Sequence, residues 1–207
     1  MVIRLAQFSL MVVIAVSFLT QSGCMRGPSR IVAPGIDADG AGQDAIKTYD
    51  TNKDSKISGA ELDKVPSLIQ ALPNFKSTKE KGVTAADITA RIKAWQATRV
   101  GRIGSVSCLV TRAGKPVQGV EVKFVPEKFL GDNMPVCTGT TGADGYAPIS
   151  APVSGPDDAP GIPPGFYRVE LTKSDGSIPA KYNTQTIFGD EVCPDVRRMT
   201  GYNYDMK

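Results

Sequence analysis

Apolar and polar side chains alternate in several short segments of the second half of the chain. Val106, Cys108 and Val110 fall on one face of residues 104–111, and the same period of two recurs over 120–124 and 167–171. A period of two is typical of a strand with one buried face. Turns rich in Gly and Pro separate these segments, as in sandwiches of short strands. The pattern predicts an antiparallel β-sandwich over residues 103–207.

A helical period characterises the part of the chain before this sandwich. Ile88, Ile92 and Trp95 follow the spacing i, i+4, i+7 and predict an amphipathic helix whose apolar stripe lies in a core. An earlier helix should be broken by Pro66 into two short pieces. Its matching apolar face is expected at Leu62, Val65, Ile69 and Leu72. The chain is therefore expected to be α+β with two domains, a helical one over residues 43–99 and the sandwich.

The first residues have the pattern of an export leader. Residues 1–19 carry one charge, at Arg4, and are mostly apolar from Leu10 to Leu19. This run is too short for a permanent transmembrane helix, and small residues follow it, so residues 1–23 are predicted to be a secretory signal peptide. Residues 24–42 are polar and contain Gly and Pro, which predicts a flexible tether.

The cleavage region, Leu19 to Cys24, offers two interpretations. Small residues directly before Cys24 resemble the lipobox of bacterial lipoproteins, in which the cysteine is lipid-modified and becomes the first residue. Gln21 departs from that pattern, because an aliphatic residue is usual three positions before the cysteine. The other interpretation is an ordinary leader with an incidental Cys24. Lipidation of Cys24 would add a diacyl group and an N-acyl chain. Stable membrane attachment takes more than one acyl chain, so this modification would hold the protein firmly at a membrane.

Composition narrows the functional classes. The chain of 207 residues is 41% hydrophobic and 22% charged, as in globular proteins, with a formal net charge of +3 and no basic run that would mark a nucleic-acid interface. It contains no histidine, which excludes Ser-His-Asp and Cys-His catalysis and every His-ligated metal site. If Cys24 is lipidated, Cys108, Cys137 and Cys193 allow at most one internal disulfide.

Oxygen-bearing side chains recur at regular positions in the segment 50–61, DTNKDSKISGAE. Side-chain oxygens stand at positions 1, 3 and 5, a backbone carbonyl is expected at position 7, position 9 acts through a water, and a glutamate closes position 12. Hard oxygen donors with this spacing suit Ca²⁺. The expected ligands are Asp50, Asn52, Asp54, Lys56, Ser58 and Glu61.

This segment resembles the calcium loop of an EF-hand. Ile57, at position 8, should then form the short strand contact through which such loops pair. Ser55 stands at position 6, where Gly is usual because φ is positive, and Lys53 and Lys56 offset part of the negative charge. Weak affinity, between roughly micromolar and millimolar, is expected. The alternative is a solvated acidic turn in which Ser58 and Glu61 form only a capping box.

A second loop is expected at residues 76–87, because EF-hands normally fold in pairs. Val83 follows Ile57, and Asp87 follows Glu61, by the same interval. Lys76 and Thr78 replace the first two metal ligands, so this loop is predicted to be structural. Thr84 and Asp87 keep the spacing of a capping box.

Three motifs connect the sandwich to a known family. They are the turns and strand starts at 114–122, 140–146 and 163–169. In this order they resemble the carboxypeptidase regulatory-like domain, a transthyretin-like (Ig-like) sandwich, over residues 103–172. The stretch 178–192 resembles a group of bacterial lipoproteins of unknown function that combine this module with EF-hand-like helices. The resemblance implies an accessory module of an exported protein and supplies no activity.

Together these patterns indicate a non-enzymatic, exported and membrane-anchored protein on the periplasmic or cell-surface side. The preferred function is a calcium-binding structural or adhesion module of the cell envelope, with an unidentified envelope protein or glycan as partner. The alternative is a carbohydrate- or protein-binding accessory protein, which needs exposed aromatic rings on the sandwich. Tyr167, Tyr182, Tyr202 and Tyr204 are candidates for stacking on sugars, although core packing at Tyr167 and a last strand at 202–204 explain three of them better.

Overall fold

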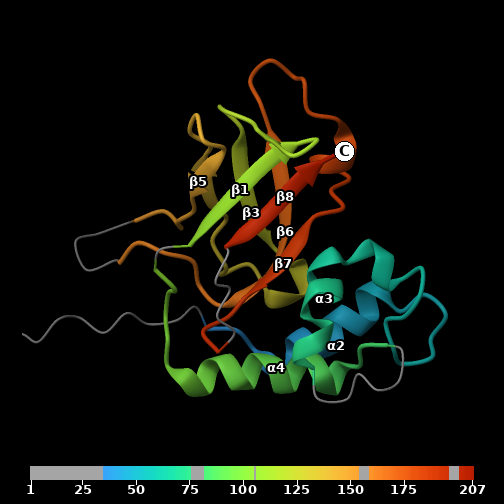
Figure 1. Ribbon diagram of the computed structural model, residues 1–207. Coiled ribbons are helices and arrows are strands. Elements are labelled where there is room, and N and C mark those ends of the chain that lie inside the picture. Colours follow the sequence, from blue (N-terminus) through green and yellow to red (C-terminus); the bar gives the residue numbers. More distant parts are fainter. Residues whose placement is uncertain (1–34, 76–81, 105, 154–158, 196–200) are drawn as a thin grey trace, which may run out of the picture. The chain divides into compact units, whose positions relative to one another are not determined.

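In the computed structural model, helices come first along the chain and two four-stranded β-sheets follow (Figure 1). The structure describes residues 35–75, 82–104, 106–153, 159–195 and 201–207. The predicted leader, Cys24 and most of the predicted tether lie outside the described residues. The α+β class expected from the sequence is confirmed for the described part.

Helix α2 (Ala38–Tyr49) begins inside the stretch 24–42 that was expected to be a flexible tether. Asp37 caps it by accepting a hydrogen bond from the N–H of Gly40 at 3.1 Å. Ala38, Ala41 and Ala45 are buried. At Gly42 a Cβ would come within 2.5 Å of the carbonyl oxygen of Ala85, at the start of α4 (Ala85–Thr98). Small residues therefore let two helices approach closely, and the predicted boundary at residue 42 is wrong for this reason.

Pro66 divides the segment after the loop, as the sequence predicted. The 3₁₀ turn η1 (Leu62–Lys64) precedes it, and α3 (Pro66–Ala71) begins with the proline at its first turn; η2 (Leu72–Asn74) follows. Val65, Leu68 and Ala71 are fully buried, whereas Leu62, Ile69 and Leu72 are half-buried. The predicted apolar face is thus shifted, because the break at Pro66 resets the helical phase.

The strands form two separate four-stranded sheets. One sheet has the order β2-β1-β5, with β8 parallel to β1; the other has the order β4-β3-β6-β7 and is antiparallel throughout (Figure 1). The strands are β1 (Ser107–Arg112), β2 (Lys115–Pro116), β3 (Glu121–Pro126), β4 (Cys137–Thr140), β5 (Tyr146–Pro148), β6 (Gly165–Thr172), β7 (Gly189–Val192) and β8 (Tyr202–Met206). Two further 3₁₀ turns are η3 (Lys128–Leu130) and η4 (Ala180–Tyr182).

The two sheets pack through the side chains that alternation predicted to be buried. Cys108 and Val110 of β1 and Phe124 of β3 are fully buried. The ring of Phe124 meets those of Tyr202 and Tyr204 in β8 at centroid distances of 5.6 and 6.2 Å. Edge-to-face contacts of this kind join one sheet to the other.

The opposite face of β6 and β7 is covered by the helices. Phe166 of β6 packs against Trp95 of α4 at 4.7 Å between ring centroids and against Phe75 at 6.1 Å. Residues 31–207 form one compact unit. Within it, the apolar stripe of α4 is buried on β6 through the contact of Trp95 with Phe166.

Candidate calcium loop

The predicted loop, residues 50–61, connects the end of α2 to η1 and turns sharply through left-handed backbone conformations. Ser55, at position 6, has φ = 67°, which is the positive φ expected at that position. Lys53 and Gly59 also have positive φ, at 63° and 51°. A side chain in this conformation costs roughly 1–2 kcal/mol relative to glycine, so Ser55 introduces strain into the loop.

The first three predicted ligands turn their side chains onto the backbone of the loop. The carboxylate of Asp50 accepts hydrogen bonds from the N–H groups of Lys53 at 2.6 Å and Ser55 at 2.9 Å. Asn52 Oδ1 accepts from the N–H of Asp54 at 2.9 Å, and Asp54 Oδ1 accepts from the N–H of Lys56 at 3.0 Å. These bonds gather the oxygens of positions 1, 3 and 5 within one tight turn.

Glu61, at position 12, reaches back to the start of the loop. Its side chain is nearly buried; Oε1 accepts hydrogen bonds from the N–H and hydroxyl groups of Thr51, each at 2.7 Å, and from the N–H of Asn52 at 3.0 Å. Oε2 accepts from the N–H of Ser58 at 3.3 Å. The Thr51 hydroxyl and these N–H groups lower the pKa of Glu61 to about 2, so the carboxylate is ionised at neutral pH.

The donor set fits a calcium ion in its chemistry and in its order along the loop. Every donor is a hard oxygen from one short segment, and the loop contains three carboxylates and two lysines. In this geometry, however, no three Asp, Glu or Cys side chains of the described residues are grouped closely enough to hold a metal. Coordination would therefore require the carboxylates of the loop to move closer together than they lie in this structure.

The predicted contact with a second loop is confirmed. Ile57 and Val83 form an isolated antiparallel bridge, with N–H to carbonyl distances of 2.8 and 3.0 Å in the two directions. The capping box is also present: Thr84 Oγ1 accepts from the N–H of Asp87, whose carboxylate accepts from the N–H of Thr84. The first part of the second loop, including Lys76 and Thr78, lies outside the described residues.

A buried polar network that the sequence did not predict joins α4 to β7. Glu191 is 1% exposed and forms an ion pair with Arg91 Nε. It also accepts hydrogen bonds from Trp95 Nε1 at 2.9 Å and Asn74 Nδ2 at 2.6 Å. Arg91 binds Asp195 through its two terminal nitrogens, at 2.6 and 2.9 Å. The only sequence signal was an acidic pair placed between Phe188 and Val192.

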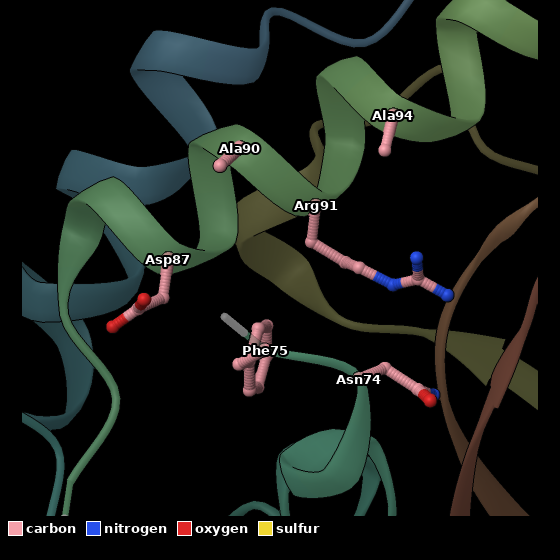
Figure 2. Close-up of a pocket in the computed structure, with 6 residues that line it drawn as sticks. All are labelled: Asn74, Phe75, Asp87, Ala90, Arg91 and Ala94. Carbon is pink, nitrogen blue, oxygen red and sulfur yellow. The ribbon is translucent and has the colours of Figure 1, made fainter. Parts of the chain in front are cut away.

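A small cavity lies between α4 and the end of η2 (Figure 2). Its volume is about 50 Å³, and it is lined by Asn74, Phe75, Asp87, Ala90, Arg91 and Ala94. Ligand pockets usually measure at least roughly 300 Å³, whereas a water needs only about 15 Å³ of this kind of space. The cavity is suited to ordered water rather than to a small organic ligand.

The tyrosines that were candidates for sugar stacking are buried. Tyr167, Tyr182, Tyr202 and Tyr204 are each no more than 7% exposed. The last two lie in β8, as predicted, and their hydroxyls donate to Glu191 O and Asp190 Oδ2. These four rings therefore do not form the exposed platform that the alternative function required.

The three cysteines of the described residues are buried free thiols. Cys108 lies on the inner face of β1, as expected from the alternation. Burial raises the pKa of each of these thiols to about 12. Such thiols are protonated at neutral pH and act as small apolar groups.

Comparisons with known protein families, with curated proteins and with solved structures find no match to this chain. Among the described residues, no helix has the length and apolar character needed to cross a membrane.

Proposed function

We propose that this chain is a calcium-binding structural or adhesion module of the bacterial cell envelope. The loop 50–61 would hold the ion through Asp50, Asn52, Asp54, the carbonyl of Lys56, Ser58 and Glu61. Helices α2 to α4 would be an EF-hand-like pair with a degenerate second loop, and the two sheets a transthyretin-like sandwich. The leader 1–23 would export the chain, and lipidation of Cys24 would anchor it.

One observation carries the calcium proposal: the loop pairs with a second loop through Ile57 and Val83. A solvated acidic turn has no need of such a partner, whereas calcium loops are normally paired at this position. The role is binding rather than catalysis, and the partner would be an envelope protein or a glycan. A calcium ion would supply the charge that holds Asp50, Asp54 and Glu61 together, and this chain supplies the oxygen ligands.

Calorimetric titration of the purified full chain with calcium tests this function. We expect one site with a Kd between roughly micromolar and millimolar, because Ser55 strains the loop and two lysines reduce its charge. Glu61→Gln keeps an oxygen for the N–H groups of Thr51 and Asn52 but loses the bidentate carboxylate. It should weaken calcium binding at least about tenfold, which corresponds to about 1.4 kcal/mol.

The matched control is Asp63→Asn, because Asp63 is an exposed acid just beyond the loop that occupies no ligand position. This variant should bind calcium as the wild type does. Equal weakening in the two variants would indicate a general effect of negative charge rather than a site. No heat from the wild type at millimolar calcium would remove the proposed function.

A further inference from the structure

A buried carboxylate, Glu127, lies where the helical segment meets the second sheet. It follows β3 and is 1% exposed. The hydroxyl of Ser67 donates to its Oε1 at 2.7 Å, and the hydroxyl of Tyr49 donates to its Oε2 at 3.2 Å. Both oxygens of this sandwich residue are therefore engaged by hydroxyls of the helical segment.

These two hydroxyls flank the candidate calcium loop. Tyr49 is the last residue of α2 and directly precedes Asp50, the first predicted ligand. Ser67 lies in the first turn of α3, after η1, which follows the last ligand, Glu61. The carboxylate of Glu127 therefore binds the chain both just before the loop, at Tyr49, and shortly after it, at Ser67.

Glu127 is itself fixed to the sheet. The N–H of Glu127 donates to the carbonyl of Phe166 in β6 at 2.9 Å. On the Ser67 side, the start of α3 lies against β7, where a Cβ on Gly189 would come within 2.5 Å of the backbone nitrogen of Ser67. On the other side, the ring of Tyr49 meets Phe129 edge-on at 6.3 Å. The two ends of the loop are therefore spaced by the sandwich.

From these contacts we infer that Glu127 is a positioning residue for the calcium loop, setting its two ends through Tyr49 and Ser67 so that calcium binding and helix-to-sheet docking are coupled. The inference rests on the proposed function. Preorganised ligands bind more tightly, because less ordering remains to be done when the ion arrives. Coupling is reciprocal, so an ion in the loop stabilises the docking of the helices on the sheet.

The chain contains its own reporter of that docking. Trp95 is the only tryptophan and is 2% exposed between α4 and Phe166. Aromatic rings connect it to the loop: Tyr49 contacts Phe129, Phe129 contacts Phe166 at 5.9 Å, and Phe166 contacts Trp95 at 4.7 Å. Calcium should therefore change the emission of Trp95 through this chain of rings.

The experiment compares Tyr49→Phe with Tyr204→Phe in the full chain. Each substitution removes one hydroxyl that donates to a buried carboxylate, but Tyr204 donates to Asp190, between the sheets, at 2.9 Å. Calcium affinity by calorimetry and the calcium-induced change in Trp95 emission are both measured. Tyr49→Phe should weaken calcium binding about three- to tenfold and reduce the emission change, whereas Tyr204→Phe should lower the melting temperature and leave calcium affinity unchanged.

The outcomes separate this inference from the proposed function. If the wild type shows no calcium heat, the proposed function fails and the inference with it. If the wild type binds calcium and Tyr49→Phe binds equally well, only the inference is overturned; equal weakening in both variants overturns it too, since the effect is then one of general stability. Should Tyr49→Phe not fold, Ser67→Ala removes the other hydroxyl and is read against the same control.

Discussion

Glu61 and Glu127 are nearly buried glutamates whose surroundings move their pKa values in opposite directions. Hydrogen bonds from Thr51 and from the loop backbone lower the pKa of Glu61. Burial raises the pKa of Glu127, although the hydroxyls of Ser67 and Tyr49 and the charge of Arg168 partly oppose that rise. The difference follows from burial, which disfavours the charged form of Glu127, and from the Thr51 hydroxyl and loop N–H groups, which hold Glu61 in its charged form.

As the pH falls, the wild type should become more stable relative to Glu127→Gln. The pKa of Glu127 is higher in the folded state than in the unfolded state, so the folded state takes up the proton first as the pH falls. The resulting gain in the free energy of unfolding is fully present below the unfolded pKa of about 4.5, and it is lost as the pH rises through the folded pKa. Urea unfolding of both proteins between pH 7 and pH 4 measures this difference. A difference that shrinks toward acid pH would contradict the assignment.

Among the elements, those defined by large apolar residues could be predicted, and those defined by small or polar residues could not. The faces of β1, β3 and β6 and the stripe of α4 are confirmed by burial. The start of α2 was missed because the alanines and glycines of a close helix contact have the composition of a linker. Glu127 and Glu191 were missed because their partners lie 60 to 117 residues away in sequence.

The candidate loop shows the same division between local and distant information. The positive φ at Ser55 and the bridge between Ile57 and Val83 follow from position in a twelve-residue pattern, and both are confirmed. The attachment of the loop to the sandwich is tertiary, so no local pattern could have predicted it. The metal itself and the lipid anchor stay predictions.

The capping box of α4 should contribute about 1 kcal/mol to the free energy of unfolding. Thr84→Ala removes the oxygen that accepts from the N–H of Asp87 at 3.2 Å, at the helix end that follows the bridge at Val83. The control is Thr48→Ala, where an exposed hydroxyl donates to the carbonyl of Asp44 inside α2 and adds little. Urea unfolding followed by Trp95 emission measures both variants; equal effects would show that the cap is not the cause.

At the scale of the whole molecule, the helices depend on the sheet for their core. Trp95 lies on Phe166, and the ion pair of Arg91 with Glu191 crosses from α4 to β7. Contacts of this kind join the helical and sheet regions in one cooperative unit, so the emission of Trp95 and the ellipticity of the backbone should report the same unfolding transition. Two resolved transitions would instead indicate separately folding domains.

The ion pair between Arg91 and Glu191 gives the most severe test of this shared core. Arg91→Met would leave Glu191, whose side chain is fully buried, without its cation, although Trp95 and Asn74 still donate to it. An uncompensated buried charge costs about 3–5 kcal/mol, a large part of the roughly 5–15 kcal/mol by which domains are stable. Adding Glu191→Gln removes that charge and keeps an oxygen for Trp95, so the double variant should be more stable than Arg91→Met alone in urea unfolding. If the double variant is instead the less stable of the two, the cost comes from lost packing, and the helices are held on the sheet by apolar contacts rather than by this pair.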